Sequence, residues 1–173
     1  CGASYPGEIA LPIWTTTPWT LPANMAVCLN PALDYVLIEG QGRALLVAEA
    51  LAQACVLRFS LPGLVVLGRC KGAALEHQLL QHCFLERQVP VILGDHVTTE
   101  AGTGAVHTAP AHGQDDFIVG RHYGLEVYNP VAANGVYLPD TEYFAGQHVL
   151  KANAAIIELL QARGVLLHAE QYQ

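Results

Sequence analysis

The feature that most constrains the fold is the division of the first half of the chain into short apolar runs, each ended by Pro, Asn or Gly. Short runs rich in β-branched residues are typical of strands. We therefore expect strands over Glu8–Thr16, Ala26–Leu29, Tyr35–Glu39, Ala44–Ala48, Leu64–Leu67 and Val89–Leu93. The Gly-containing link at residues 40–42 predicts that the strands on either side of it form a hairpin.

The remaining pattern predicts three helices, a tight turn and a last strand. The helices are expected over Glu49–Leu57, Asp116–Tyr123 and Gln147–Arg163. The third is the clearest, because its apolar residues form a wide stripe at helical spacing and Gly164 follows its end. Asn134-Gly135 is the strongest two-residue turn signal, and Val165–His168 has the pattern of a final strand.

Many short strands with a few helices indicate an α+β fold, with a β-barrel-like curved sheet core and several peripheral helices. The length of 173 residues fits a single domain over residues 1–173, and 52% hydrophobic residues are enough for a sizeable core. No run of 18 apolar residues occurs, so a membrane partner is not expected. Residues 1–6 have neither an initiator Met nor a signal-peptide pattern, which suggests a domain excised from a larger protein.

Charge and cysteine content limit the possible partners and the compartment. The formal net charge of −7 argues against a broad nucleic-acid-binding surface, which would be basic. If the partner is a nucleic acid, we expect this chain to bind only a terminus of that nucleic acid. The chain has five cysteines, an odd number, and no C-x-x-C motif. We therefore expect reduced thiols and a cytoplasmic protein. Cys28 and Cys55 lie in apolar runs and are expected in the core.

The first segment that could carry chemistry is Trp14–Asn24, which holds four threonines, two tryptophans and two prolines. Each Thr hydroxyl both donates and accepts, so the cluster could orient a hydroxyl, an ester carbonyl or a water molecule. The structural alternative is a strand that runs into a Pro turn, since Thr is a good strand residue.

The second segment is Gly102–Asp116, in which small residues precede two histidines and two aspartates. Its functional interpretation is a pocket where a carboxylate pairs with a cationic group while small residues set the depth. In the structural interpretation, Asp115 or Asp116 caps a helix and His107 is a satisfied core histidine. Both can hold in one segment, because a cap needs only one of the two aspartates.

These two segments, T-T-T-P-W-T-L-P-A-N and G-T-G-A-V-H-T-A-P-x-H-G-x-D-D, resemble the signature segments of the editing domain inserted into bacterial isoleucyl-tRNA synthetases. They occur in the expected order, about 75 residues apart, and the resemblance extends to the region of Asn134. Valyl and leucyl enzymes share the architecture but have a T-T-R-P-E-T type of first motif, so residues 17–19 favour the isoleucyl member. The ATP-binding signatures of the synthetase catalytic domain are missing, as expected for an editing domain alone.

The resemblance also implies site residues. Catalytic roles fall on Thr16, Thr17, Asn24 and Asp116, and substrate contacts fall on Thr15, Trp19, Gly102, Thr103, Gly104, His107 and Ala109. Asp116 is expected to pair with the α-ammonium of the misattached amino acid. His107 is expected to exclude the longer isoleucine side chain, and Trp19 to contact the terminal adenosine.

The implied activity is hydrolysis of the valyl ester of valyl-tRNA(Ile), with valyl-adenylate as a further substrate. A second, smaller pocket is needed because one methylene is worth only about 1–3 kcal/mol, as the isoleucyl enzymes themselves exemplify. No residue is an evident nucleophile, so we expect attack by a positioned water. The implied partners are the 3′-terminal adenosine of tRNA(Ile) carrying valine and the remainder of the synthetase. No cofactor and no metal are expected in this domain.

Other interpretations fit parts of the same pattern. A metal hydrolase could use His107, His112, Asp115 and Asp116, although their spacing fits no common zinc motif. A non-catalytic module could hold an amino acid or a tRNA end without turnover. The chain could be a free-standing deacylase, or it could come from a valyl enzyme that rejects threonine.

Overall fold

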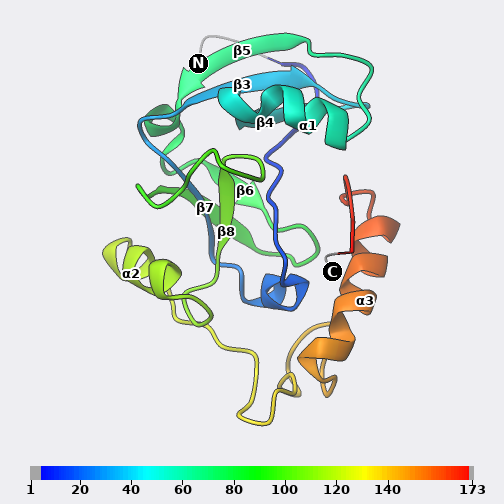
Figure 1. The fold of residues 1–173 in the computed structure, drawn as a ribbon. Coiled ribbons are helices and arrows are strands. Elements are labelled where there is room, and N and C mark those ends of the chain that lie inside the picture. The colour runs from blue at the N-terminus through cyan, green and yellow to red at the C-terminus, as the bar shows by residue number, and fades with distance from the viewer. Residues whose placement is uncertain (1–4, 172–173) are drawn as a thin grey trace.

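The computed structural model describes residues 5–171, which contain eight strands in two four-stranded sheets, three α-helices and three short 3₁₀ helices (Figure 1). The upper sheet, sheet A, has the order β1-β4-β3-β5, and the lower sheet, sheet B, has the order β6-β7-β2-β8. The strands of sheet A are β1 (Ile9–Ala10), β3 (Asp34–Glu39), β4 (Ala44–Ala48) and β5 (Val66–Lys71). Those of sheet B are β2 (Ala26–Leu29), β6 (Leu79–Gln81), β7 (Gln88–Leu93) and β8 (Ala105–Thr108).

Sheet A is built around the predicted hairpin. β3 and β4 pair antiparallel from Tyr35 with Ala48 to Glu39 with Ala44, and Gly42 has a φ of +77° in the link between them. The helix expected from residue 49 is confirmed as 3₁₀ helix η2 (Glu49–Leu51) followed by α1 (Ala52–Arg58). α1 covers one face of this sheet (Figure 1), and Cys55 is fully buried there.

Sheet B brings together segments that are far apart in the sequence. β2 pairs parallel with β7, placing Val27 beside Val91, and antiparallel with β8, placing Val27 beside His107. All four residues of β2 are buried. The threonine-rich segment, residues 14–24, therefore leads directly into the strand that lies beside the second segment, residues 102–116.

Residues 102–104 join the two sheets. The backbone N–H of Ala48 in β4 donates to the Thr103 carbonyl at 2.8 Å, and the Tyr35 hydroxyl donates to the Gly104 carbonyl at 2.5 Å. Gly104 has a φ of +83°, and a Cβ there would lie 2.4 Å from the Ala48 Cβ. Only glycine permits this conformation together with such a close approach.

The other two α-helices lie at the lower end of the molecule (Figure 1). α2 (Gln114–His122) begins two residues before the predicted start and ends before Gly124, whose φ is +68°. α3 (Val149–Ala162) confirms the C-terminal helix, and it packs against the 3₁₀ helix η1 (Pro18–Ala23). The remaining 3₁₀ helix is η3 (Gly72–Leu75).

One predicted strand is much shorter than expected, and another is wrong. Only Ile9–Ala10 of the strand expected over Glu8–Thr16 is formed, because Pro12 has no N–H and Thr15 uses its hydroxyl to accept from the Thr17 N–H at 3.0 Å. The strand expected over Val165–His168 is absent from the described part of the chain. Instead, the Val165 N–H caps α3 by donating to the Leu160 carbonyl at 3.0 Å, after Gly164 at a φ of +67°.

Other predictions need smaller corrections. The strand expected over Leu64–Leu67 begins and ends later, as β5, and β6 and β8 were not predicted as strands. The α+β class is confirmed. The strand pairing of residues 5–171 gives two open sheets, so the barrel-like closure stays a prediction. Cys28 and Cys55 are buried free thiols, as expected, and Cys1 lies outside the described residues. No helix in residues 5–171 is long and apolar enough to cross a membrane.

Candidate functional site

The threonine-rich segment forms an exposed turn. The Thr15 hydroxyl accepts from the Thr17 N–H at 3.0 Å and lies 3.4 Å from the Thr17 hydroxyl. This side chain-to-backbone bond replaces strand pairing and fixes the turn locally. Thr16 and Thr17 are exposed, and the Thr16 hydroxyl makes no hydrogen bond within residues 5–171. The Thr16 hydroxyl is thus available to a ligand or to water.

η1 follows this turn and connects it to β8. The Thr20 hydroxyl donates to the Thr17 carbonyl at 2.9 Å and lies 2.8 Å from His107 Nε2. Because the single Thr20 proton goes to a carbonyl, the hydroxyl oxygen accepts from His107, and His107 carries its proton on Nε2. The Trp19 ring packs edge-on against the His112 ring, with 5.1 Å between centroids. Two residues of η1 therefore touch two residues of the second segment.

His107 is neutral in this arrangement. It is almost fully buried, and burial, with His82 and His112 as neighbours, lowers its pKa from 6.5 to about 4. Its Nδ1 is buried and has no hydrogen-bond partner among the described residues. The predicted satisfied core histidine is thus satisfied at only one of its two nitrogens.

Asp116 lies in the first turn of α2, half-buried. Its Oδ2 accepts from the Ala109 N–H at 3.0 Å, which connects the helix to the end of the second segment. Burial raises the pKa of this carboxyl, while the Ala109 amide and the nearby His96 and His112 lower it. The predicted helix cap is wrong for both aspartates, since Gly113 is the N-cap and Asp115 is exposed in the first turn.

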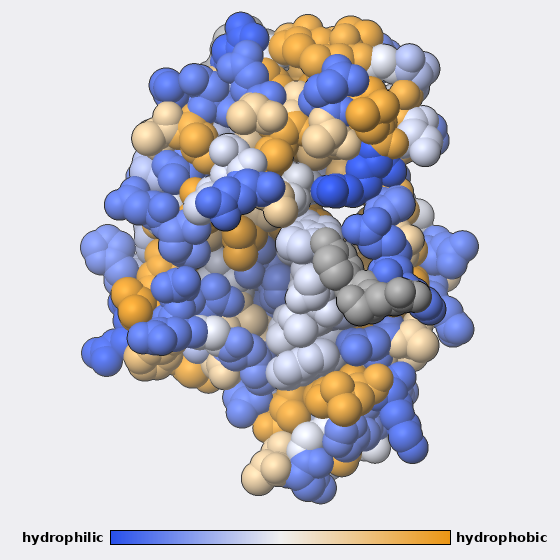
Figure 2. Space-filling model, in the orientation of Figure 1, coloured by the Kyte–Doolittle hydropathy of each residue, from blue (hydrophilic) through white to orange (hydrophobic). Residues whose placement is uncertain are grey.

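Several other predicted site residues have structural contacts. The side-chain Oδ1 of Asn24 accepts from the Ala26 N–H at 3.1 Å, at the start of β2. The Thr103 hydroxyl donates to the Pro12 carbonyl at 2.6 Å, and the turn at Gly102 packs on Trp14. These contacts bring residues 102–104 to the threonine-rich segment. Figure 2 shows the segment before η1 as a pale, weakly polar ridge beside a hollow in this face. The substrate contacts of Asn24 and residues 102–104 stay predictions.

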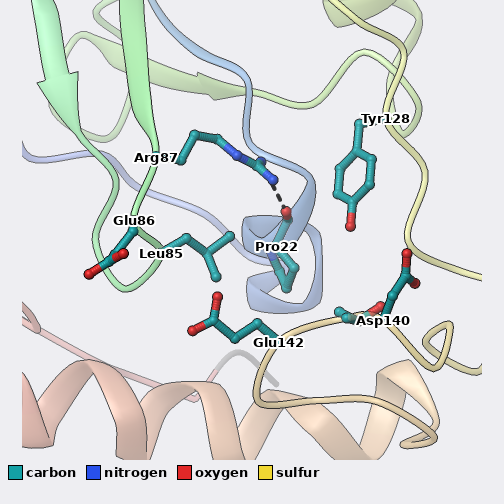
Figure 3. A pocket seen from close by; sticks show the side chains of 8 residues that line it. Pro22, Leu85, Glu86, Arg87, Tyr128, Asp140 and Glu142 are labelled. Atoms are coloured by element: carbon teal, nitrogen blue, oxygen red, sulfur yellow. Dashed lines mark hydrogen bonds between the residues drawn. The ribbon is translucent and has the colours of Figure 1, made fainter.

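A cavity of about 180 Å³ borders the far end of η1. Figure 3 shows it between Pro22, the link from β6 to β7, and the segment that carries Tyr128 and Asp140. Arg87 borders it with its guanidinium on the Asn24 carbonyl at 3.0 Å. Its acidic lining residues are Glu86, Asp140 and Glu142, and none of the predicted site residues lines it. Carboxylates at its mouth make it unsuited to a phosphate or a carboxylate ligand.

The four side chains considered as metal ligands do not form a metal site. Within residues 5–171, no group of three or more His, Cys, Asp or Glu side chains is arranged to hold a metal ion. Asp115 is exposed, and the Nε2 of His107 is occupied by Thr20. The described geometry gives the metal-hydrolase interpretation no support.

Sequence reasoning did not single out the side chains that hold η1 in place. The Trp19 N–H donates to Asn153 Oδ1, and the Trp19 carbonyl accepts from the Tyr137 hydroxyl. His82 Nε2 lies 2.9 Å from the Leu21 carbonyl, and Arg87 reaches the carbonyls of residues 22 and 24. The sequence gives no signal for these contacts, because each joins residues 61 to 134 positions apart.

A family model described as "Leucyl-tRNA synthetase, editing domain" matches residues 69–162, which is more than half of the chain. The matched range contains the second segment and the whole of α2 and α3, while the threonine-rich segment lies before it. The isoleucine–tRNA ligase of Alkalilimnicola ehrlichii is 57% identical over 171 residues, and that of Shewanella putrefaciens is 57% identical over 175 residues. Each match covers 99% of this chain but only 18% and 19% of the ligase, so the chain spans about a fifth of these relatives.

Two solved structures share the fold. The crystal structure of GlLeuRS-CP1 superposes with a TM-score of 0.74 at 16% identity, covering 96% of this chain and 86% of that one. The editing domain of the cytosolic leucyl-tRNA synthetase of P. knowlesi gives a TM-score of 0.67 at 12% identity, covering 91% and 82%. At these identities the likeness concerns the fold alone.

Proposed function

Because the chain belongs to the family of aminoacyl-tRNA synthetase editing domains, we propose that it hydrolyses the ester of valine wrongly attached to isoleucine tRNA. Family membership implies hydrolytic proofreading, and the names of the curated relatives favour isoleucine tRNA as the carrier. The observation that carries the proposal is the 2.8 Å contact between Thr20 and His107, which joins the two segments across 87 positions. A site that needs hydroxyls from one segment and a carboxylate from the other requires this juxtaposition.

Asp116 binds the α-ammonium of the valyl group in this proposal. Its Oδ2 is held by Ala109, and the other oxygen is left for a cation. A pKa raised by burial reflects a carboxylate that lacks enough water or positive charge around it, which an ammonium would supply. His107 forms the wall that excludes isoleucine, and its neutral, hydrogen-bonded ring is a firm surface against an apolar side chain.

The exposed turn organises the water that attacks the ester. Thr16 offers a hydroxyl without an internal partner, and Thr17 is held beside Thr15. Hydroxyls fixed in a rigid turn can orient both the water and the ester carbonyl at low entropic cost. Asn24 and Thr15 complete this side of the site, and Trp19, with residues 102–104, accepts the terminal adenosine.

The proposed partners follow from the charge of the chain. A net charge of −7 cannot hold the body of a tRNA, so the remainder of an isoleucine–tRNA ligase binds it and delivers the 3′ end. Valyl-adenylate fits the same site, since it presents the same ammonium, side chain and adenosine. Free thiols agree with a cytoplasmic location.

The proposal is tested by incubating the chain with valyl-tRNA(Ile) and isoleucyl-tRNA(Ile) and measuring release of each amino acid. Asp116→Asn is the informative variant, because an amide oxygen can still accept from the Ala109 N–H while the negative charge is lost. Asp115→Asn, one residue away and exposed, is the matched control. We expect a loss of roughly 10- to 100-fold in valine release for Asp116→Asn, as for a charge-assisted contact of about 1.5–3 kcal/mol, and no loss for the control.

The outcomes separate the parts of the proposal. Equal release of both amino acids would retain a deacylase and refute exclusion by size. Should the isolated chain release neither, the same variants are measured in an isoleucine–tRNA ligase that contains this domain. An Asp116→Asn ligase that still clears valine as the unmodified enzyme does would overturn the ammonium-binding role.

A further inference from the structure

η1 is a short helix that lacks some of its backbone N–H donors. It is a six-residue 3₁₀ helix with prolines at its first and fifth positions, and these remove two N–H donors. Its backbone groups therefore need partners from elsewhere in the fold. Figure 1 shows η1 between the lower end of sheet B and α3, where such partners are within reach.

Trp19 receives a partner at both of its backbone groups. Its N–H donates to Asn153 Oδ1 at 3.0 Å, and its carbonyl accepts from the Tyr137 hydroxyl at 2.5 Å. Asn153 lies on α3, 134 positions away, and Tyr137 lies in the segment before α3, 118 positions away. Both residues are outside the two segments that suggested the function.

The two partners are themselves held firmly. Tyr137 is 1% exposed and belongs, with Phe144, Leu21 and Ile156, to the hydrophobic core between η1 and α3. Burial raises the pKa of its phenol, so the hydroxyl stays protonated and remains a donor. Asn153 follows Ala152, which is fully buried on the face of α3 that joins the same core. Asn153 on α3 and the buried phenol of Tyr137 thus hold the two peptide groups on either side of Trp19.

Holding this backbone also sets the Trp19 ring. The Trp19 ring packs edge-on against the His112 ring, with 5.1 Å between centroids. This packing joins η1 to the loop that leads to Asp116. We infer that Asn153 and Tyr137 are positioning residues, which hold Trp19 against His112 and so fix the adenosine side of the site. This inference rests on the proposed function for its catalytic consequence. Its structural part stands on the two hydrogen bonds.

The test compares Asn153→Ala, Asn153→Asp and Tyr137→Phe in the 173-residue chain, with Lys151→Ala as an exposed control on the same helix. The Asp variant keeps an oxygen that accepts from the Trp19 N–H, whereas the Ala variant does not. Hydrogen exchange is followed in peptides that cover residues 18–21. We expect faster exchange of the Trp19 amide in Asn153→Ala, and unchanged exchange in Asn153→Asp and Lys151→Ala.

Steady-state deacylation of valyl-tRNA(Ile) gives the functional readout, with rates divided by the folded fraction. We expect Asn153→Ala and Tyr137→Phe to raise KM about three- to tenfold, with kcat within about twofold, since adenosine binding is remote from the ester. Asn153→Asp should restore KM. A purely structural role would lower the folded fraction and leave KM unchanged.

Each outcome decides one claim. Unchanged hydrogen exchange of the Trp19 amide in both Asn153→Ala and Tyr137→Phe would show that these two residues do not hold Trp19. Faster exchange with an unchanged KM overturns its role in substrate binding. If an isoleucine–tRNA ligase that contains the wild-type domain also releases no valine, the proposed function is refuted, and the exchange experiment still decides whether Asn153 and Tyr137 hold Trp19. If Tyr137→Phe fails to fold, Asn153→Ala and its Asp rescue decide both questions.

Discussion

Sheets A and B have the same number of strands but are assembled in different ways. The central pair of sheet A is a hairpin whose strands are separated by four residues, and its helix follows immediately. Sheet B pairs β2 with β7 and β8, about 60 and 80 positions away, and the first segment leads into β2 and contacts β8 through Thr20 and His107. Sheet A thus has a local hairpin at its centre, and its paired strands are closer in sequence than β2 is to β7 or β8. The site is attached to the sheet that depends on distant contacts.

The largest effect is expected where the two sheets meet. Gly104→Ala introduces a Cβ 2.4 Å from the Ala48 Cβ at a φ of +83°, so both a collision and backbone strain oppose it. We expect a loss of about 3–4 kcal/mol in the free energy of unfolding, measured by urea denaturation. Gly42→Ala is the matched control, because Gly42 has a similar φ of +77° with nothing within 4 Å.

The control should cost only about 1–2 kcal/mol, the backbone term alone. Equal losses in the two variants would show that the close approach of residues 102–104 to β4 does not hold the sheets together.

Acid should weaken the sheet B end of the molecule. The pKa values of His82 and His107 are lowered from 6.5 to about 4, mainly by burial. Between pH 6.5 and pH 4 the unfolded chain binds protons that the folded chain does not, so stability falls as the pH falls through this range. The loss is up to about 3 kcal/mol for each histidine, at 1.36 kcal/mol per pKa unit.

Urea denaturation at pH 7, 6, 5 and 4 measures this loss. A His82→Gln variant should show a shallower decline than the wild type, while His122→Gln, at an exposed position, should follow the wild type. A pH profile that His82→Gln leaves unaltered would contradict the assignment of the acid sensitivity to buried histidines.

A smaller effect is expected from the link between the two candidate segments. Thr20→Val keeps the shape of the side chain but leaves the buried Nε2–H of His107 without an acceptor. We expect a loss of about 1–3 kcal/mol by thermal or urea denaturation. Thr20→Ser retains the hydroxyl and should recover most of this stability; a Ser variant as unstable as the Val variant would show that packing of the methyl group dominates.

The smallest effect is expected at the outer edge of sheet A. Val66 is the first residue of β5 and is 44% exposed. Val66→Thr should change the free energy of unfolding by less than about 0.5 kcal/mol. Val91→Thr, in the buried β7, should cost about 1–3 kcal/mol by the same measurement. Similar values for the two would remove the contrast between the sheets.

The same contrast explains how much of the fold the sequence predicts. The β3–β4 hairpin, the helix after residue 49 and α3 were predictable, because each is specified by contacts between near neighbours. β8 was not, since it is only four residues long, lies in a Gly-containing segment, and pairs with β2 about 80 positions away. The strand predicted up to Thr16 does not form there, because the Thr15 hydroxyl accepts from the Thr17 N–H in place of a strand partner.

The candidate site divides in the same way. The residue types of Thr15–Thr17 and Asp116 suggested chemistry from the sequence, and the structure brings their two segments into contact through Thr20 and His107. Which partner each residue has was not predictable. The Asn24 side chain accepts a hydrogen bond from the backbone at the start of β2. The hydrogen-bond partners of the Trp19 backbone are Tyr137 and Asn153, which no sequence pattern marks out.

The grip on Trp19 sets an order of events during synthesis. Within this domain, residues 14–24 leave the ribosome before most of sheet A, whose strands can pair once β5 has emerged. The segment that carries the threonines must then wait for β8, for Tyr137 and finally for Asn153 before its backbone is held on all sides. A nascent chain stopped between residues 71 and 137 would have all four strands of sheet A and an unfinished site. The chemistry of this domain becomes available only when nearly its whole length has been translated.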